Sequence, residues 1–101
     1  MRRISISPLI YPDVVEPGEK YTVAFQVENE SFIPVAPVFC RLRRGEEVYW
    51  QFGYFGVFKR VVVFKFELET KEEEKEKLIA EAGFTPVNLI ASSELEITVK
   101  G

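Results

Sequence analysis

The sequence predicts an all-β protein, an antiparallel β-sandwich of about seven strands with one late crossover helix over residues 71–82. Apolar and polar residues alternate with a period of two along several stretches, as they do in strands with one buried face. Turn residues interrupt this alternation roughly every ten residues, a spacing typical of sandwiches. The period changes once, after Thr70, where a hydroxyl residue precedes a run of glutamates.

The alternation places the strands individually. The clearest strand covers residues 20–29, and its inward residues would be Tyr21, Val23, Phe25 and Val27. Six further strands are expected over residues 3–7, 35–44, 48–58, 60–70, 87–91 and 94–100. Proline and glycine between them indicate turns, because proline fixes φ and glycine allows positive φ.

The helix is predicted from its ends. Thr70 to Glu73 has the form of a capping box, and glutamates in the first turn suit the positive end of a helix dipole. Gly83 would end the helix in a left-handed conformation. The alternative is a ferredoxin-like α+β fold with a β-α-β unit over residues 60–91. That fold needs a second helix before residue 60, where no segment has a helical period, so the sandwich is favoured.

Residues 15–31 resemble bacterial and archaeal cell-adhesion-related (CARDB-like) domains of the immunoglobulin-like class. A turn at Pro17-Gly18-Glu19, an alternating strand and a closing Asn29 carry the resemblance, which extends loosely to Arg44. It implies an immunoglobulin-like sandwich in which the Asn29 side chain ties the following loop to the backbone. It also implies a role as a spacer or adhesion module without an active site. The charged segment after residue 70 departs from the pattern, as does the absence of a secretion signal.

Composition excludes several classes of protein. The chain has 101 residues, 47% apolar, which suits one domain over residues 1–101 with a substantial core. A lone Cys40 excludes an intramolecular disulfide, and the absence of histidine excludes Ser/His and Cys/His catalytic pairs. We expect no enzyme, no cofactor and no metal site. A net charge of −3 argues against a nucleic-acid partner.

The location is predicted from what the chain lacks. No apolar run reaches the roughly 18 residues of a membrane span, and the basic N-terminus has no apolar stretch behind it. The expectation is therefore a cytoplasmic or virion protein. The acids are glutamates with the single exception of Asp13, a bias that favours a heat-adapted source.

The most informative segment for function is residues 48–58, which carries six aromatic residues. They are Tyr49, Trp50, Phe52, Tyr54, Phe55 and Phe58. If Trp50, Phe52 and Phe58 fill the core, Tyr49 and Phe55 must lie on the outer face, so a core alone cannot bury them all. Exposed aromatic clusters mark partner surfaces. The alternatives are cover by another part of the chain, a protein or self-association surface, and a platform for stacking sugars.

Other candidate sites have simpler interpretations. A basic strip made of Arg41, Arg43, Arg44, Lys59 and Arg60 could bind single-stranded nucleic acid, but a solvated strand face paired with Glu67 and Glu69 is favoured. The acidic run over residues 72–76 is interpreted as a solvated helix face rather than a catalytic or metal cluster. The sequon at Asn29 is interpreted as a turn, and Cys40 as a small core residue.

These observations together predict a non-catalytic structural or interaction protein that assembles through the aromatic strand. The partner would be a protein or a second copy of the chain, and the setting a virion or appendage of a thermophile. The alternative is a carbohydrate-binding module that stacks a polysaccharide on Trp50 or a neighbouring tyrosine.

Overall fold

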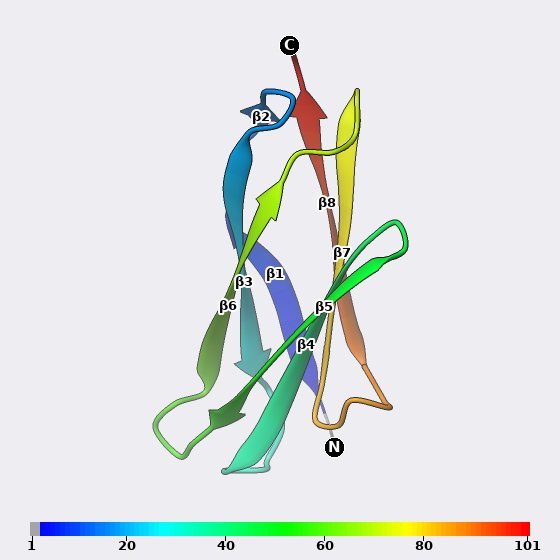
Figure 1. Ribbon diagram of the computed structural model, residues 1–101. Coiled ribbons are helices and arrows are strands. Elements are labelled where there is room, and N and C mark those ends of the chain that lie inside the picture. Colours follow the sequence, from blue (N-terminus) through cyan, green and yellow to red (C-terminus); the bar gives the residue numbers. More distant parts are fainter. Residues whose placement is uncertain (1–2) are drawn as a thin grey trace.

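The computed structural model describes residues 3–101, which form eight strands in two facing sheets (Figure 1). The strands are β1 (Ile4–Ile10), β2 (Val14–Val15), β3 (Lys20–Asn29), β4 (Ala36–Arg44), β5 (Glu47–Phe55), β6 (Val61–Glu69), β7 (Lys75–Gly83) and β8 (Ala91–Val99). No helix occurs in this part of the chain. The all-β class is therefore confirmed, and the prediction of a crossover helix over residues 71–82 is wrong.

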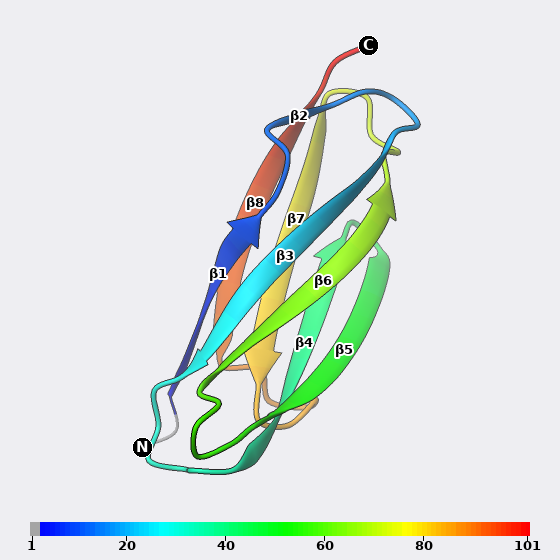
Figure 2. The same cartoon turned by 90° about the vertical axis from the view of Figure 1, so that its left-hand side faces the viewer.

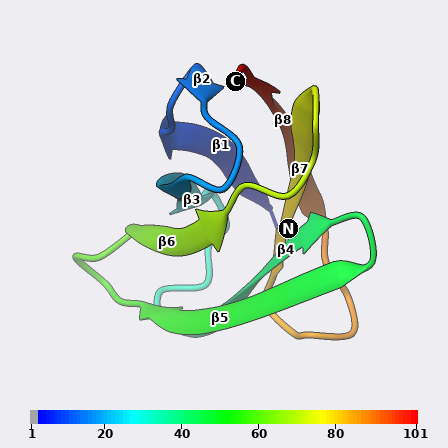
Figure 3. The same ribbon diagram turned by 45° about the horizontal axis from the view of Figure 1, so that its top comes forward.

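The two sheets have different widths. One has the strand order β1-β3-β6, and the other has the order β2-β8-β7-β4-β5. All neighbours pair antiparallel except β2, which runs parallel to β8. Viewed from above, β1 lies against β7 and β8 while β6 faces β5 (Figure 3). The edge strand β5 thus lies at the open side of the larger sheet.

The core follows the predicted alternation in the strongest strands. In β3 the inward residues Tyr21, Val23, Phe25 and Val27 are all buried. The inward residues of β6 are also buried, and so are those of β8: Val62, Phe64, Phe66, Leu68, Leu95, Ile97 and Val99. These side chains fill the space between the sheets, which is why the period-two pattern predicted their strands correctly.

The segment expected as a helix is β7, a central strand. It pairs with β4 on one side and β8 on the other, and its buried positions alternate through Glu76, Leu78, Ala80 and Ala82. The alternation was hard to see because all four residues are good helix formers and one of them is charged. Hydrogen bonding to two neighbouring strands outweighs that local preference. Thr70 caps no helix; its hydroxyl and its amide both donate to the carbonyl of Glu19.

The strand expected at residues 87–91 is also wrong, because residues 84–90 form the loop between β7 and β8. Gly83 has no positive φ. Glycine is needed there for space, since a Cβ would meet the carbonyl oxygen of Asn88 at 2.3 Å. This close approach lets the loop fold back against the end of β7, where the amide of Ile90 donates to the carbonyl of Ala82.

The sandwich is elongated, with extents of 47 × 24 × 16 Å. The N-terminal end of the described chain lies beside the β3–β4, β5–β6 and β7–β8 loops, and the C-terminus lies at the opposite end (Figure 1). No helix long and apolar enough to cross a membrane is present in residues 3–101.

Candidate functional site

The outer face of β4 and β5 carries a group of exposed aromatic side chains. Phe52 is 69% exposed, Tyr54 61% and Trp50 46%, and all three alternate on the side of β5 that faces away from β6. Phe39 of β4 lies directly across from Phe52, with ring centroids 6.2 Å apart. We call Phe39, Val48, Trp50, Phe52 and Tyr54 the aromatic face.

The other aromatic residues of the segment do not belong to this face. Phe55 is buried and meets Phe84 edge-on, with ring centroids 6.2 Å apart. Tyr49 packs partly against the core and donates its hydroxyl to Glu47. Phe58 lies in the β5–β6 loop, beyond the end of the strand. The distribution is thus the reverse of the one considered from the sequence, because β5 buries its odd-numbered positions.

Gly53 fixes the position of β5. Its pairing with Val38 is regular, so it marks no bulge. A Cβ at this residue would lie 3.3 Å from Val62 Cγ1 and 3.7 Å from the ring of Phe64. The absence of a side chain therefore lets β5 approach β6 closely, and the even-numbered aromatics of β5 are left pointing outward.

Two arginines next to the aromatic face share one glutamate. Glu81 of β7 accepts hydrogen bonds from Arg41 at 2.9 and 3.1 Å and from Arg43 at 2.8 Å. Burial acts to raise the pKa of Glu81, but the hydrogen bonds and charges of Arg43 and Arg41 together outweigh it and lower that pKa. The Arg41 guanidinium also lies over the Trp50 ring, 5.5 Å from its centroid. The face is therefore apolar at β5 and bordered by an ion-paired group with one net positive charge.

The proposed basic strip is not brought together. Arg41 and Arg43 are paired with Glu81 rather than with Glu67 and Glu69, as the sequence had suggested. Arg44 points into the protein and is almost fully buried. Lys59 and Arg60 follow the far end of β5, in the β5–β6 loop. The structure therefore shows no continuous phosphate-binding surface over these five residues.

Sequence reasoning missed a buried polar cluster between the sheets. Arg44 Nη1 lies 2.6 Å from Glu76 Oε1, which also accepts the Tyr21 hydroxyl at 2.7 Å. Arg44 also donates to the carbonyl of Glu69 and to Glu47. The interpretation of residues 72–76 as a wholly solvated face is therefore wrong, because Glu76 is fully buried. The missed signal was its alternation with Leu78 and Ala80.

The cluster shifts the acidity of its members. Burial and then the hydrogen bond to Glu76 raise the pKa of Tyr21 well above its usual range. Burial acts to lower the pKa of Arg44, but the charge of Glu76 and hydrogen bonds to both glutamates outweigh it and raise that pKa. Every buried side-chain nitrogen or oxygen in residues 3–101 has a partner. The polar groups of the cluster are therefore all hydrogen-bonded within the protein.

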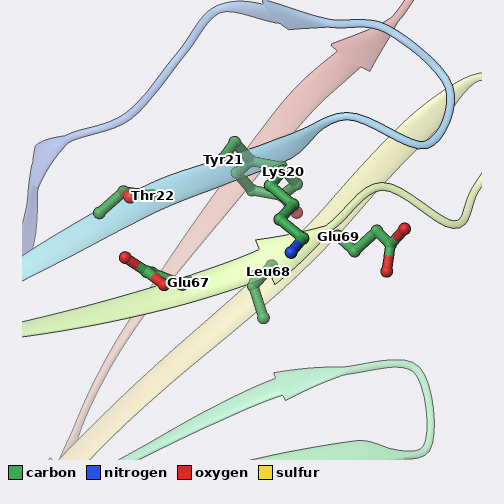
Figure 4. Close-up of a pocket in the computed structure, with 6 residues that line it drawn as sticks. All are labelled: Lys20, Tyr21, Thr22, Glu67, Leu68 and Glu69. Carbon is green, nitrogen blue, oxygen red and sulfur yellow. The ribbon is translucent and has the colours of Figure 1, made fainter.

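A shallow depression of about 400 Å³ lies over the paired ends of β3 and β6 (Figure 4). It is lined by Lys20, Tyr21, Thr22, Glu67, Leu68 and Glu69. Its charged residues are exposed, and the Tyr21 hydroxyl is already bonded to Glu76. We assign no reaction to it.

The chain is similar in structure to several known proteins, although no protein-family model and no curated protein sequence matches it. One is the CARDB domain of the PF1109 protein from Pyrococcus furiosus, solved in complex with di-metal ions; its TM-score is 0.69 at 19% identity over 96% of this chain and 85% of that one. A β-glucosidase from Listeria innocua matches with a TM-score of 0.64 and 14% identity, over 99% of this chain but 16% of the enzyme. A conjugative transposon lipoprotein from Bacteroides eggerthii matches with a TM-score of 0.60 and 9% identity, over 93% of this chain and 95% of the lipoprotein.

Two features of this chain bear on those comparisons. Within residues 3–101, no group of three or more Cys, Asp or Glu side chains is arranged to hold a metal ion. The Asn29 side chain accepts from the Ser31 amide and donates to the Ile33 carbonyl, as the resemblance predicted. The strand arrangement, the strand-closing asparagine and the structural similarity together identify the fold as that of a CARDB-like, immunoglobulin-like module.

Proposed function

We propose that residues 1–101 act as one non-catalytic interaction module, which associates with a second copy of the chain through the aromatic face. The observation that carries this proposal is the exposure of Trp50, Phe52 and Tyr54 on one edge strand. The inward side of that strand is already packed by Tyr49 and Phe55. The exposed aromatics are therefore not needed for folding, and large aromatic groups at a surface are the usual anchors of protein interfaces.

The geometry suits a self-complementary contact. A two-fold dimer places the same patch on both partners, so the patch must not repel itself. The aromatic face meets this requirement because its five residues are uncharged, and Glu81 offsets one of the two arginine charges at its border. The strand also has an unpaired edge, since β5 pairs only with β4. A second copy could therefore bury the aromatic side chains and pair with this edge.

The test is the solution mass of the purified chain, measured by light scattering. The wild type is expected to be a dimer or larger, and the combined substitution Phe52→Glu and Tyr54→Glu is expected to give a monomer with an unchanged β-sheet spectrum. Val63→Glu is the matched control, because Val63 is an exposed apolar residue on the opposite sheet. A monomeric wild type, or dissociation by Val63→Glu alone, would refute self-association through this face.

A polysaccharide is the alternative ligand for the same aromatic side chains. It is less well supported, because the Arg41 guanidinium covers part of the Trp50 ring and the most exposed aromatic residue of the strand is a phenylalanine, Phe52. A shift of tryptophan fluorescence with a soluble glucan, lost on Trp50→Ala, would favour it over self-association.

We place the module in a repeating assembly, such as a virion or an appendage of a heat-adapted source. The elongated shape supports this setting, because it leaves long sides along which copies can stack. Thermal unfolding tests the heat-adapted part, for which we expect a midpoint above about 90 °C.

A further inference from the structure

One end of the sandwich carries bulky apolar side chains at the tips of its loops. The β3–β4, β5–β6 and β7–β8 loops all lie towards this end (Figures 1 and 2). Phe32 is 92% exposed, Val87 is 93% exposed and Phe58 is fully exposed, one on each loop. Val35 and Val57 accompany them, with more than half of each side chain exposed. We call these five residues the apolar end.

Two of these loops are held rigidly in the conformation that exposes their phenylalanines. The side chains of Asn29 and Ser31 form hydrogen bonds to each other and to the backbone on both sides of Phe32. Arg60, which follows Phe58 closely, donates to the carbonyl of Asn29 at 2.9 Å and to that of Ser31. The polar groups thus turn inward while the phenylalanines point outward. A preorganised loop loses little entropy when its exposed side chain is buried by a partner.

Charge is distributed unequally between the two ends. The loops of the apolar end, residues 30–35, 56–60 and 84–90, contain the cations Lys59 and Arg60, and their single acid, Glu30, is paired with Arg3. The loops of the opposite end, residues 11–13, 16–19 and 70–74, contain one cation, Lys71. Their six acids are Asp13, Glu16, Glu19, Glu72, Glu73 and Glu74. An anionic surface would therefore attract the apolar end and repel the opposite one.

We infer that the apolar end docks on an anionic lipid surface. Phe32, Phe58 and Val87 enter the boundary between headgroups and acyl chains, and Lys59 contacts the anionic headgroups. Separate projecting side chains suit a fluid bilayer, which can close around each of them, whereas a protein partner needs matching hollows for three loops. Insertion gains free energy from the apolar area that is buried and from attraction between cations and anionic lipids. This surface is distinct from the aromatic face and does not depend on it.

The test is co-sedimentation of the full chain with two kinds of vesicle, one of phosphatidylcholine alone and one of phosphatidylcholine mixed with phosphatidylglycerol. Wild type is expected to bind the mixed vesicles. Phe32→Ser combined with Phe58→Ser should weaken that binding about tenfold or more, because two large apolar side chains no longer enter the lipid. Lys59→Glu should weaken it about fivefold or more, and only for the anionic vesicles.

Matched controls separate the docking from other effects. Val63→Ser removes an exposed apolar side chain that belongs to neither surface, and Lys100→Glu reverses an exposed cation near the C-terminus; both should bind as wild type does. Absence of wild-type binding to the mixed vesicles would overturn the inference, and so would binding that Phe32→Ser with Phe58→Ser leaves unchanged. Equal binding to both vesicles would overturn the role given to anionic headgroups. A lower solution mass for the Phe32/Phe58 variant, without vesicles, would show instead that this end joins copies of the chain.

Discussion

The buried cluster around Glu76 gives the sharpest quantitative prediction for this fold. Replacing Arg44 with Met keeps most of the side-chain length but removes the cation that lies 2.6 Å from the Glu76 carboxylate. Glu76 is fully buried, and its remaining donors would be the Tyr21 hydroxyl at 2.7 Å and the Glu72 amide at 3.1 Å. The carbonyl of Glu69 would lose its Arg44 donor as well.

These losses set the magnitude. Breaking a buried ion pair by removing one partner costs about 3–5 kcal/mol, because the remaining charge stays desolvated. The unpaired Glu69 carbonyl places Arg44→Met in the upper part of that range. A domain of this size is stable by about 5–15 kcal/mol, so the variant should still fold but close to the limit. With a urea m-value of about 2 kcal/mol/M, the unfolding midpoint should fall by about 2 M.

The assay is equilibrium urea unfolding followed by circular dichroism at pH 7. Arg43→Met is the matched control; Arg43 is half-exposed in its pair with Glu81, so its loss should cost less than about 1 kcal/mol. The combined replacement Tyr21→Phe, Arg44→Met and Glu76→Leu removes every charge and hydroxyl of the cluster, and it should recover most of the lost stability. A cost below about 1 kcal/mol for Arg44→Met would refute the view that this buried pair is essential to the stability of the larger sheet.

Three further outcomes are expected. The hydrogen bonds from Tyr49 and Lys71 contribute most to lowering the pKa of Glu47 from 4.5 to about 2. The ionised Glu47 therefore stabilises the fold above pH 4.5. The difference in urea midpoint between wild type and Glu47→Gln should shrink below that pH and vanish near pH 2. Gly83→Ala should lower the free energy of unfolding by at least about 1–3 kcal/mol in thermal unfolding. Gly56→Ala should leave it unchanged, because a Cβ at Gly56 would meet nothing closer than 3.8 Å. Burial raises the pKa of the Cys40 thiol to about 12, so a thiol reagent should modify Cys40 only at the rate of unfolding.

The strands that the sequence predicted correctly share a simple property. In β3 and β6 the inward positions are large and apolar and the outward ones mostly polar. The alternation therefore allowed a single assignment of inward and outward residues. Each strand also ends at a residue with a clear role, as β3 does at Asn29. Local pattern and tertiary packing agree in these segments, and that agreement is what makes a strand predictable.

In β7 the local pattern and the packing disagree. Its inward positions are a glutamate, a leucine and two alanines, which give only a weak apolar alternation and favour a helix by propensity. The strand exists because Arg44, which is distant in sequence, compensates Glu76, and because β4 and β8 complete its hydrogen bonds. Neither partner can be inferred from the segment itself. The alternation of Glu76 with Leu78 and Ala80 is visible in the sequence, but the partners that make a buried glutamate stable are not.

The sequence indicated which segment carries the exposed aromatic residues, but not which of these residues point outward. Six aromatics in residues 48–58 showed correctly that not all of them could be buried. Their direction depended on the position of Gly53, which allows close packing on Val62 and Phe64 and so points its even-numbered neighbours outward. Phe32 was overlooked because a single aromatic residue in a loop has no periodicity, and its exposure became evident only from the inward hydrogen bonds around it.

The two apolar surfaces lie on different sides of the molecule, so they can be occupied at once. The aromatic face lies along the side of the larger sheet, and the apolar end lies at the tip of the long axis (Figure 2). A module standing on a lipid surface by its apolar end would present its aromatic face sideways, where a neighbouring copy stands in the same orientation. The two contacts then make separable predictions. The Phe52/Tyr54 variant should be monomeric and still bind anionic vesicles, whereas the Phe32/Phe58 variant should keep the wild-type mass and lose vesicle binding. A single variant that abolished both would show that the surfaces are coupled, and the picture of two independent contacts would be wrong.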